Sequence, residues 1–191
     1  RQFSGAGEGS GNPSTEREGG FRGTGTVYFR TTFTYSNVGG GAGDWTGVSN
    51  YDFAAELNFM GIVGGPNEFA IQVHGQGQPS VNRSGIFANF GETYTLIGKV
   101  DYDNDLLAMW VNPDGADVDS AVGGSADVIT TSYTGGNWTT GLRLGAGAGA
   151  SSAFDEILAA DDFATVAVPE PTTLVLVALG LVGVISHRRR R

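Results

Sequence analysis

Carboxylates are the side chains of this sequence best suited to chemistry, and several of them stand close together. Asp155 is followed directly by Glu156, and Asp161 and Asp162 come soon after. A glycosidase needs two carboxyl groups, one as general acid and one as nucleophile or base. One group of sandwich folds that cleave glycans carries them with the spacing Glu-x-Asp-x-x-Glu, which these residues lack. A catalytic pair at Asp155 or Glu156 is therefore the minor interpretation, and strand-end carboxylates bonded to backbone amides are the main one.

Nucleophilic catalysis and zinc chemistry lack the residues they need. The chain has no cysteine, and His74, in Gln72-Val73-His74, is its one histidine before the C-terminal tail. No Gly-x-Ser-x-Gly elbow is present to supply an activated serine. A single histidine at a strand end is usually solvated, and it cannot by itself hold zinc. The sequence therefore predicts a protein that is not an enzyme.

Calcium is the one cofactor that the sequence suggests. The stretch around Asp101, Asp103 and Asp105 supplies oxygen ligands within one short turn, and Asp114, Asp117 and Asp119 follow it. Loop carboxylates of this kind are what Ca²⁺ prefers. The alternative is that a turn rich in Asp and Asn is only a turn. We take Asp101, Asp103 and Asp105 as the candidate metal ligands.

Aromatic residues near expected loops form a second candidate site. Trp45 and Trp138 are the main candidates, with Tyr51 and Tyr133 beside them in sequence. An exposed ring can stack on the face of a pyranose, whereas a buried one fills the end of a sandwich. We take Trp45 and Trp138 as candidate carbohydrate-binding residues.

The charge of the chain excludes some partners. The net charge is −9, yet the last four residues, Arg188, Arg189, Arg190 and Arg191, are all basic. Setting these 4 aside leaves 7 of the 11 basic residues against 20 acidic ones, a balance of −13. Such a surface repels phosphates, so nucleic acid is not an expected partner.

Apolar alternation predicts several short strands. The period of two is clearest from Thr26 to Tyr35 and from Thr93 to Asp103, and Leu106–Asn112 is apolar on both faces, which suits a central strand covered on two sides. The glycine run at residues 145–149 predicts a loop. Further strands are expected at Tyr51–Met60, Glu68–His74, Gly141–Leu144, Phe154–Leu158 and Phe163–Val168.

These strands predict an all-β fold, an antiparallel β-sandwich or jelly roll, over residues 24–167. Residues 1–23 are polar and glycine-rich, and we expect them to be a flexible lead-in or part of a truncated loop. The opening strand at Thr26, the hairpin from Lys99 to Pro113 and the closing strand at Phe154 resemble the concanavalin A-like sandwiches of the laminin-G type. The resemblance implies adhesion or carbohydrate binding, and it favours calcium.

The tail has three parts: a Pro-Glu-Pro spacer at residues 168–171, an uncharged apolar run at residues 172–186 and a basic end at residues 187–191. As a helix the run would be about 22 Å long, which inserts into a bilayer but spans its core of roughly 30 Å poorly. The basic end would stay in the cytoplasm and leave the domain outside the inner membrane. A permanent tail anchor remains one interpretation.

Pro169, Glu170 and Pro171, followed by an apolar segment and a basic end, resemble the PEP-CTERM sorting signal of Gram-negative bacteria. The resemblance implies an exosortase as partner, cleavage near the motif, and delivery to the cell surface or the extracellular matrix. We therefore expect a non-enzymatic surface protein that contributes adhesion or exopolysaccharide association in biofilms. The alternatives are a carbohydrate-binding module of a larger secreted enzyme, or a glycosidase-like sandwich with its acid pair near Asp155.

Overall fold

The computed structural model describes most of the domain and none of the tail beyond residue 167. Predictions for other residues, including Trp138, Pro169, Glu170, Pro171 and the terminal arginines, lie outside the described part. The described residues are 2–4, 15–17, 25–37, 45–52, 55–65, 67–74, 80–131, 141–147 and 150–167.

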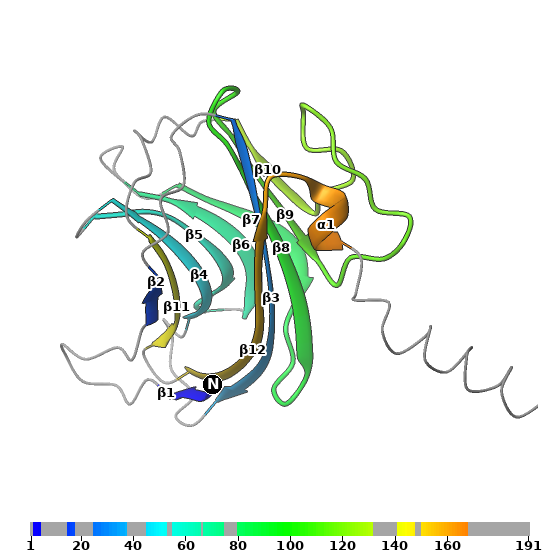
Figure 1. The fold of residues 1–191 in the computed structure, drawn as a ribbon. Coiled ribbons are helices and arrows are strands. Elements are labelled where there is room, and N and C mark those ends of the chain that lie inside the picture. Colours follow the sequence, from blue (N-terminus) through cyan, green and yellow to red (C-terminus); the bar gives the residue numbers. More distant parts are fainter. Residues whose placement is uncertain are drawn as a thin grey trace, which may run out of the picture.

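Twelve strands form two antiparallel six-stranded sheets, which confirms the predicted all-β sandwich (Figure 1). In sheet A the order is β1 (Gln2–Ser4), β12 (Ala150–Ala160), β3 (Thr26–Asn37), β8 (Thr93–Asp101), β9 (Leu106–Val111) and β10 (Val128–Thr130). In sheet B the order is β2 (Thr15–Arg17), β11 (Gly141–Gly147), β4 (Trp45–Asp52), β5 (Ala55–Val63), β6 (Glu68–Val73) and β7 (Ser80–Phe87).

The main core lies between the two sheets and follows the predicted alternation. On β3, Phe29, Phe33 and Tyr35 are buried on the face toward sheet B, and on β8 Leu96 and Val100 join them. Sheet B contributes the alternate residues Met60 and Ile62 from β5, with further residues from β6. This one-sided burial leaves the opposite face of sheet B available for other side chains.

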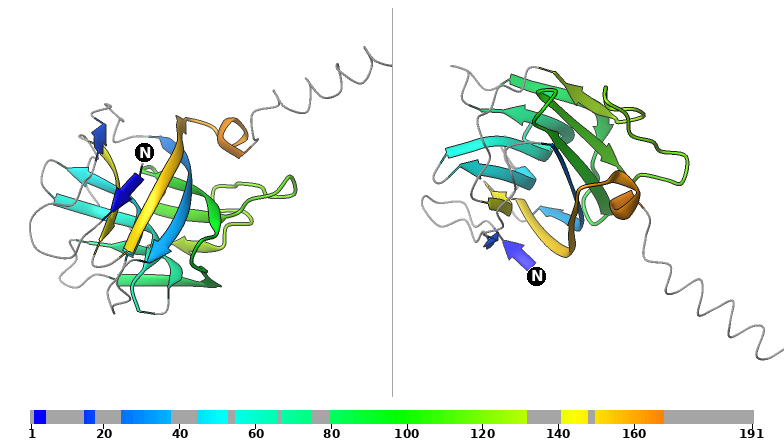
Figure 2. Two further views of the ribbon diagram at one scale, coloured as in Figure 1. Left: turned by 90° about the horizontal axis from the view of Figure 1, so that it is seen from below. Right: turned by 45° about the horizontal axis from the view of Figure 1, so that its top comes forward.

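A second apolar cluster covers the outer face of sheet A. All six residues of β9 are buried, as predicted for a strand covered on both sides. Leu107 and Met109 face the main core, whereas Ala108 and Trp110 belong to the second cluster. The helix α1 (Phe163–Ala167) closes this cluster, and it lies on the opposite side of the molecule from β4, β5 and β11 (Figures 1 and 2).

The strand predicted at Phe163–Val168 is wrong, because residues 163–167 form the helix α1. Asp162 caps its start: the carboxylate accepts the backbone N–H of Thr165 at 2.9 Å and the Thr165 hydroxyl at 2.5 Å. Phe163 and Val166 then lie on one helical face, against Trp110 and its neighbours. Five residues are too few for an apolar pattern to distinguish the helical period of 3.6 residues from the strand period of two.

Three further predictions differ from the structure. The strand expected at Tyr51–Met60 is a hairpin, since β4 ends at Asp52 and β5 begins at Ala55 with Asp52 paired to Ala55. The glycine run expected as a loop begins inside β11, which continues to Gly147. Residues 1–23, expected as a lead-in, contribute the short edge strands β1 and β2.

The predicted transmembrane run at residues 172–186 is not among the described residues. Within the described part of the chain, no helix is long and apolar enough to cross a membrane.

Candidate functional site

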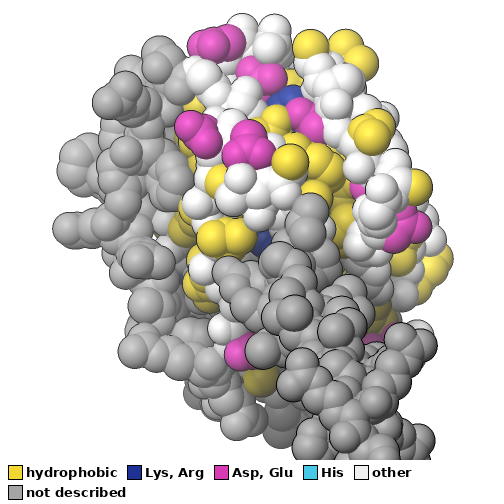
Figure 3. Space-filling view, turned by 45° about the vertical axis from the view of Figure 1, so that its right-hand side comes forward, with side chains coloured by type: hydrophobic (Ala, Val, Ile, Leu, Met, Phe, Trp, Pro, Cys, Tyr) yellow, Lys and Arg dark blue, Asp and Glu magenta, His cyan; other side chains and the backbone are white. Residues whose placement is uncertain are grey.

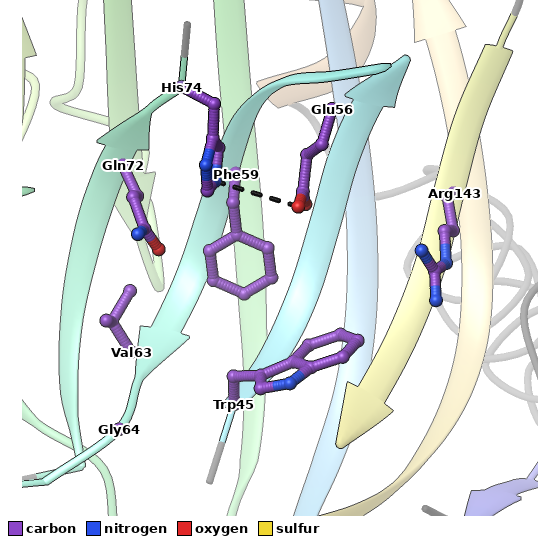
Figure 4. Close-up of a pocket in the computed structure, with 8 residues that line it drawn as sticks. All are labelled: Trp45, Glu56, Phe59, Val63, Gly64, Gln72, His74 and Arg143. Carbon is purple, nitrogen blue, oxygen red and sulfur yellow. Dashed lines mark ion pairs between the residues drawn. The ribbon is translucent and has the colours of Figure 1, made fainter. Parts of the chain in front are cut away.

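A groove of about 430 Å³ lies on the outer face of sheet B, the face that does not contribute to the core. Its walls come from four adjacent strands, β11, β4, β5 and β6, and from the residue that follows each of β5 and β6 (Figure 4). The sheet therefore brings together residues that are far apart in the sequence. The lining residues are Trp45, Glu56, Phe59, Val63, Gly64, Gln72, His74 and Arg143.

The centre of the groove is a pair of aromatic rings on a floor of glycines. Trp45 and Phe59 meet edge to face, with ring centroids 5.8 Å apart at 86°. A Cβ added to Gly147 would lie 2.4 Å from Nε1 of Trp45, and one added to Gly47 would lie 2.9 Å from Cζ of Phe59. The rings occupy this space because the strands beneath them carry no side chain there.

Arg143 stands beside this aromatic pair. Its guanidinium carbon lies 5.9 Å from the centre of the Trp45 ring and 5.3 Å from that of Tyr51. Nη1 donates to the Tyr51 hydroxyl, while the buried Nε has no hydrogen-bond partner among the described residues. Among the side chains that the structure describes, the guanidinium is thus held by two aromatic rings and one tyrosine hydroxyl.

His74 and Glu56 form the other polar side of the groove. Nε2 of His74 lies 3.6 Å from Oε2 of Glu56, and the two side chains are 27% and 30% exposed. Ser49 donates its hydroxyl to Oε1 of the same carboxylate. The register between β4 and β5 shifts between Asn50 and Tyr51, and this shift pairs Tyr51 with Glu56. The preceding pair, Asn50 and Asn58, is buried beneath the groove face. The expectation that His74 is merely solvated is therefore wrong.

Of the two predicted sugar-binding tryptophans, Trp45 lies in the groove and Trp138 lies outside the described residues. Sequence reasoning missed Arg143, Phe59 and the pairing of His74 with Glu56. The sequence contained one signal that Arg143 faces the groove: Arg143 shares one face of its strand with Gly145 and Gly147, which leave that face open.

The predicted calcium ligands do not converge on one point. The carboxylate of Asp101 faces Nζ of Lys99 at 3.5 Å and accepts the side-chain amide of Asn104 at 3.0 Å. Asp103 accepts the backbone N–H of Gly25 at 3.1 Å, and Asp105 is exposed with a φ of 50°. Among the described side chains, no three His, Cys, Asp or Glu residues are grouped so as to hold a metal ion.

The acidic pair near the C-terminal end of the domain lies on sheet A, away from the groove. Oε2 of Glu156 pairs with Nε of Arg30 at 3.3 Å, and Asp155 is exposed. The two residues sit in a bulge of β12, between the paired positions Phe154 and Ile157. This geometry gives Glu156 a structural partner.

A second hollow, of about 750 Å³, lies beside α1 and is acidic. Figure 3 shows carboxylates gathered over this face. Asp119 accepts the Tyr28 hydroxyl at 2.5 Å and Nζ of Lys99 at 2.9 Å. Burial, together with Asp119, holds the pKa of Tyr28 well above its ordinary value. The aspartates that line it are Asp114, Asp117, Asp119, Asp161 and Asp162.

Comparisons with known proteins support both the predicted sorting tail and the predicted β-sandwich domain. Residues 167–191 match the PEP-CTERM protein-sorting motif. No curated protein sequence shows significant similarity to this chain.

Solved structures show the fold of the domain. A family 7 alginate lyase, A1-II', in complex with product is 12% identical, with a TM-score of 0.53 over 82% of this chain and 75% of that one. The alginate lyase from Corynebacterium sp. is 9% identical, with a TM-score of 0.52 over 74% of this chain and 61% of that one. The binding domain of botulinum neurotoxin serotype C1 is 5% identical, with a TM-score of 0.50 over 72% of this chain and 33% of that one.

This chain spans only 18% of a bifunctional protein from Bacteroides eggerthii and 64% of another alginate lyase structure. At these identities the similarity establishes the jelly-roll sandwich and no activity. The chain therefore combines a jelly-roll β-sandwich with a PEP-CTERM protein-sorting motif at residues 167–191, which marks it as an exported protein.

Proposed function

We propose that this protein binds a polysaccharide in the groove on sheet B and acts, without cleaving it, at the cell surface or in the extracellular matrix. The observation that carries the proposal is the aromatic pair Trp45 and Phe59, held against the glycine floor of the sheet. Rigid rings beside fixed polar groups suit a pyranose, which has apolar faces and a rim of hydroxyls.

The polar residues around the rings support the same conclusion. Gln72 and His74 lie on one side of the rings, Arg143 lies on the other, and Glu56 lies between His74 and Arg143 (Figure 4). They provide both donors and acceptors for hydroxyl groups. The similar structures include lyases that act on a polysaccharide, which agrees with a glycan ligand for this fold.

The sorting motif supports a location of the protein outside the cytoplasm. We propose that an exosortase recognises the tail, cleaves near Pro169, Glu170 and Pro171, and releases the domain to the surface or the exopolysaccharide matrix. A bound polysaccharide would then hold the domain in a biofilm, which is the adhesion function that the sequence suggests. A carbohydrate-binding module of a larger secreted enzyme would use the same groove.

The test is to offer the full chain a panel of polysaccharides and to measure both retention and cleavage. Affinity electrophoresis reports retention, and the release of reducing ends reports cleavage. We expect retention by at least one polysaccharide, and we expect no release of reducing ends. Absence of retention on every member of the panel would contradict the proposal.

A second candidate function is cleavage of the bound glycan, and one specific observation favours it. The groove holds an imidazole beside a carboxylate, His74 with Glu56, and a tyrosine hydroxyl that accepts a hydrogen bond from Arg143. An imidazole and a carboxylate placed in this way can act as general base and general acid. Turnover that is lost in a His74→Asn variant, with glycan retention unchanged, would favour this second function over binding alone.

A further inference from the structure

We infer that the helix α1 limits the processing of the tail, because it has to leave the domain before an enzyme can cut near Pro169–Pro171. The inference rests on the proposed sorting of the chain and adds a step to it that the folded domain itself controls. The motif and the fold overlap in one residue: the match to the sorting motif begins at Ala167, which is also the last residue of α1.

Two apolar side chains hold one face of α1 against sheet A. Val166 is 0% exposed and belongs to the second apolar cluster. The ring of Phe163 lies 4.7 Å from the Trp110 ring and 6.0 Å from the Tyr28 ring, measured between centroids. The helix is therefore part of the packed domain (Figure 1).

The end of α1 nearest the motif is fixed by a hydrogen bond as well. Nη1 of Arg30 donates to the backbone carbonyl of Val166 at 3.4 Å, and this bond is buried. Nε of the same guanidinium lies 3.3 Å from Oε2 of Glu156, so Arg30 is itself held in place. A cation at the C-terminal end of a helix also interacts favourably with the free carbonyls there. The last turn before the motif is thus tied to the sheet.

The sequence leaves very little chain between α1 and the proposed cut. Pro169 is the second residue after Ala167, and two fully extended residues span about 7 Å. An enzyme that cuts a peptide binds it in an extended form, through backbone groups that a helix uses in its own hydrogen bonds. A cleft that reaches Pro169 therefore meets the residues of α1 while they are still helical and packed. These residues can enter the cleft only after α1 has come off the sheet.

Release of α1 leaves the rest of the fold in place. A helix of five residues is too short to be stable once it leaves its packing surface. It packs on side chains of sheet A, and residues 163–167 take no part in the strand pairing of that sheet. Local opening of such a segment needs less free energy than unfolding of the domain, and proteolysis follows the population of the open form. The processing rate should therefore rise when the packing of α1 is weakened.

The experiment follows the shortening of the pulse-labelled full chain in its native host. Val166→Ala removes buried methyl groups from the contact between α1 and the sheet. We expect the tail to be lost about tenfold faster than in the unchanged chain, because the open population is larger. Hydrogen exchange of the full chain in detergent should show the same increase for the amides of residues 164–167.

Val48→Ala is the matched control. It makes the same change at a residue that is 1% exposed but lies in the main core, not in the cluster that contains α1. This variant should be processed at the rate of the unchanged chain, although both substitutions lower the stability of the domain. Circular dichroism checks that each variant is folded.

A spacer provides the second test. About six Gly and Ser residues inserted after Ala167 form a flexible chain, which gives an enzyme an extended segment while α1 stays packed. The insertion should speed processing, and Val166→Ala should then add nothing further to the rate.

The outcomes separate this inference from the proposed sorting. Equal processing rates in Val166→Ala and Val48→Ala, or an effect of Val166→Ala that is as large with the spacer as without it, would overturn the role of α1. Faster hydrogen exchange without faster processing would overturn it too, and so would a spacer that slows processing. A chain that keeps Arg191 in every variant would instead overturn the proposed sorting.

Discussion

The indole of Trp45 lies against the backbone at Gly147 of the neighbouring strand, where a Cβ would come 2.4 Å from Nε1. This contact sets the orientation of the ring in the groove. We predict that Gly147→Ala tilts the indole away from the sheet and weakens glycan binding by about tenfold, comparable to the loss of one aromatic contact. Calorimetry with the best-retained glycan measures the change.

Gly115→Ala is the matched control for this substitution. A Cβ there meets nothing within 4 Å, and Gly115 does not line the groove. The Gly115→Ala variant should bind the glycan with the same affinity as the unchanged protein. If Gly147→Ala also binds normally, the glycine floor does not position Trp45.

Lys99 is the second test, because it neutralises two buried carboxylates at once. Its side chain is 2% exposed, and Nζ lies 2.9 Å from Asp119 and 3.5 Å from Asp101. Lys99→Met leaves both carboxylates without their cation, which should lower the free energy of unfolding by about 3–5 kcal/mol. Urea denaturation gives this value.

Arg83→Met provides the comparison, because its side chain is 39% exposed. Its partner Glu68 is only 10% exposed but keeps a hydrogen bond from the backbone N–H of Gly85, so the loss should be smaller than for Lys99→Met. Equal losses in the two variants would mean that the buried network around Lys99 adds nothing beyond a half-exposed pair.

Glu92 gives a prediction about pH. The Tyr94 hydroxyl donates to its carboxylate at 2.8 Å, and together with the Asn89 amide it holds the pKa of Glu92 below the ordinary value. A lowered carboxyl pKa stabilises the fold above the pKa of the unfolded chain, and this stabilisation is lost as the pH falls through the folded value. Tyr94→Phe should therefore raise the pKa of Glu92, as measured by NMR titration.

The same titration contains its own control. Thr165 lowers the pKa of Asp162 through two hydrogen bonds at the start of α1, and Tyr94 has no part in that interaction. The Asp162 pKa should not move in Tyr94→Phe. An unchanged Glu92 pKa in that variant would contradict the assigned cause.

Sorting through the tail predicts a shortened protein at the cell surface. The motif match covers residues 167–191 and begins at the last residue of the helix α1. Mass spectrometry of the surface fraction of the native host should find chains that end near Pro169–Pro171. Chains that still end at Arg191 would mean a permanent membrane anchor instead of processing.

The sequence predicted those strands whose apolar residues form a regular pattern, on one face or on both. The alternation at Thr26–Tyr35 gave β3, and the apolar stretch from Leu106 gave β9 with both faces buried. The hairpin between Tyr51 and Ala55 was missed because residues 51–55 contain no Gly, Pro or Asn. The edge strand β7 was missed as well, because two of its half-buried positions are the polar residues Asn82 and Ser84, while the apolar Val81 and Phe87 are exposed.

The groove could be predicted only in part. Trp45 was found from its residue type alone, since a tryptophan near a loop is a candidate for sugar stacking. Its neighbours Phe59, His74 and Arg143 come from β5, the end of β6 and β11, and the order of those strands in sheet B brings them together. Pairing between strands distant in sequence leaves no local signal, so the composition of the site followed only from the topology.

The most direct test of the account is the effect of Trp45→Ala on glycan affinity, measured by calorimetry on the full chain. Phe90→Ala is the control, because Phe90 is also aromatic and 51% exposed but packs on Tyr35, outside the groove lining. We predict that Trp45→Ala loses tenfold or more in affinity, roughly the worth of one stacked ring, while Phe90→Ala binds normally. Unchanged binding by Trp45→Ala would contradict the assignment of the groove as the glycan site.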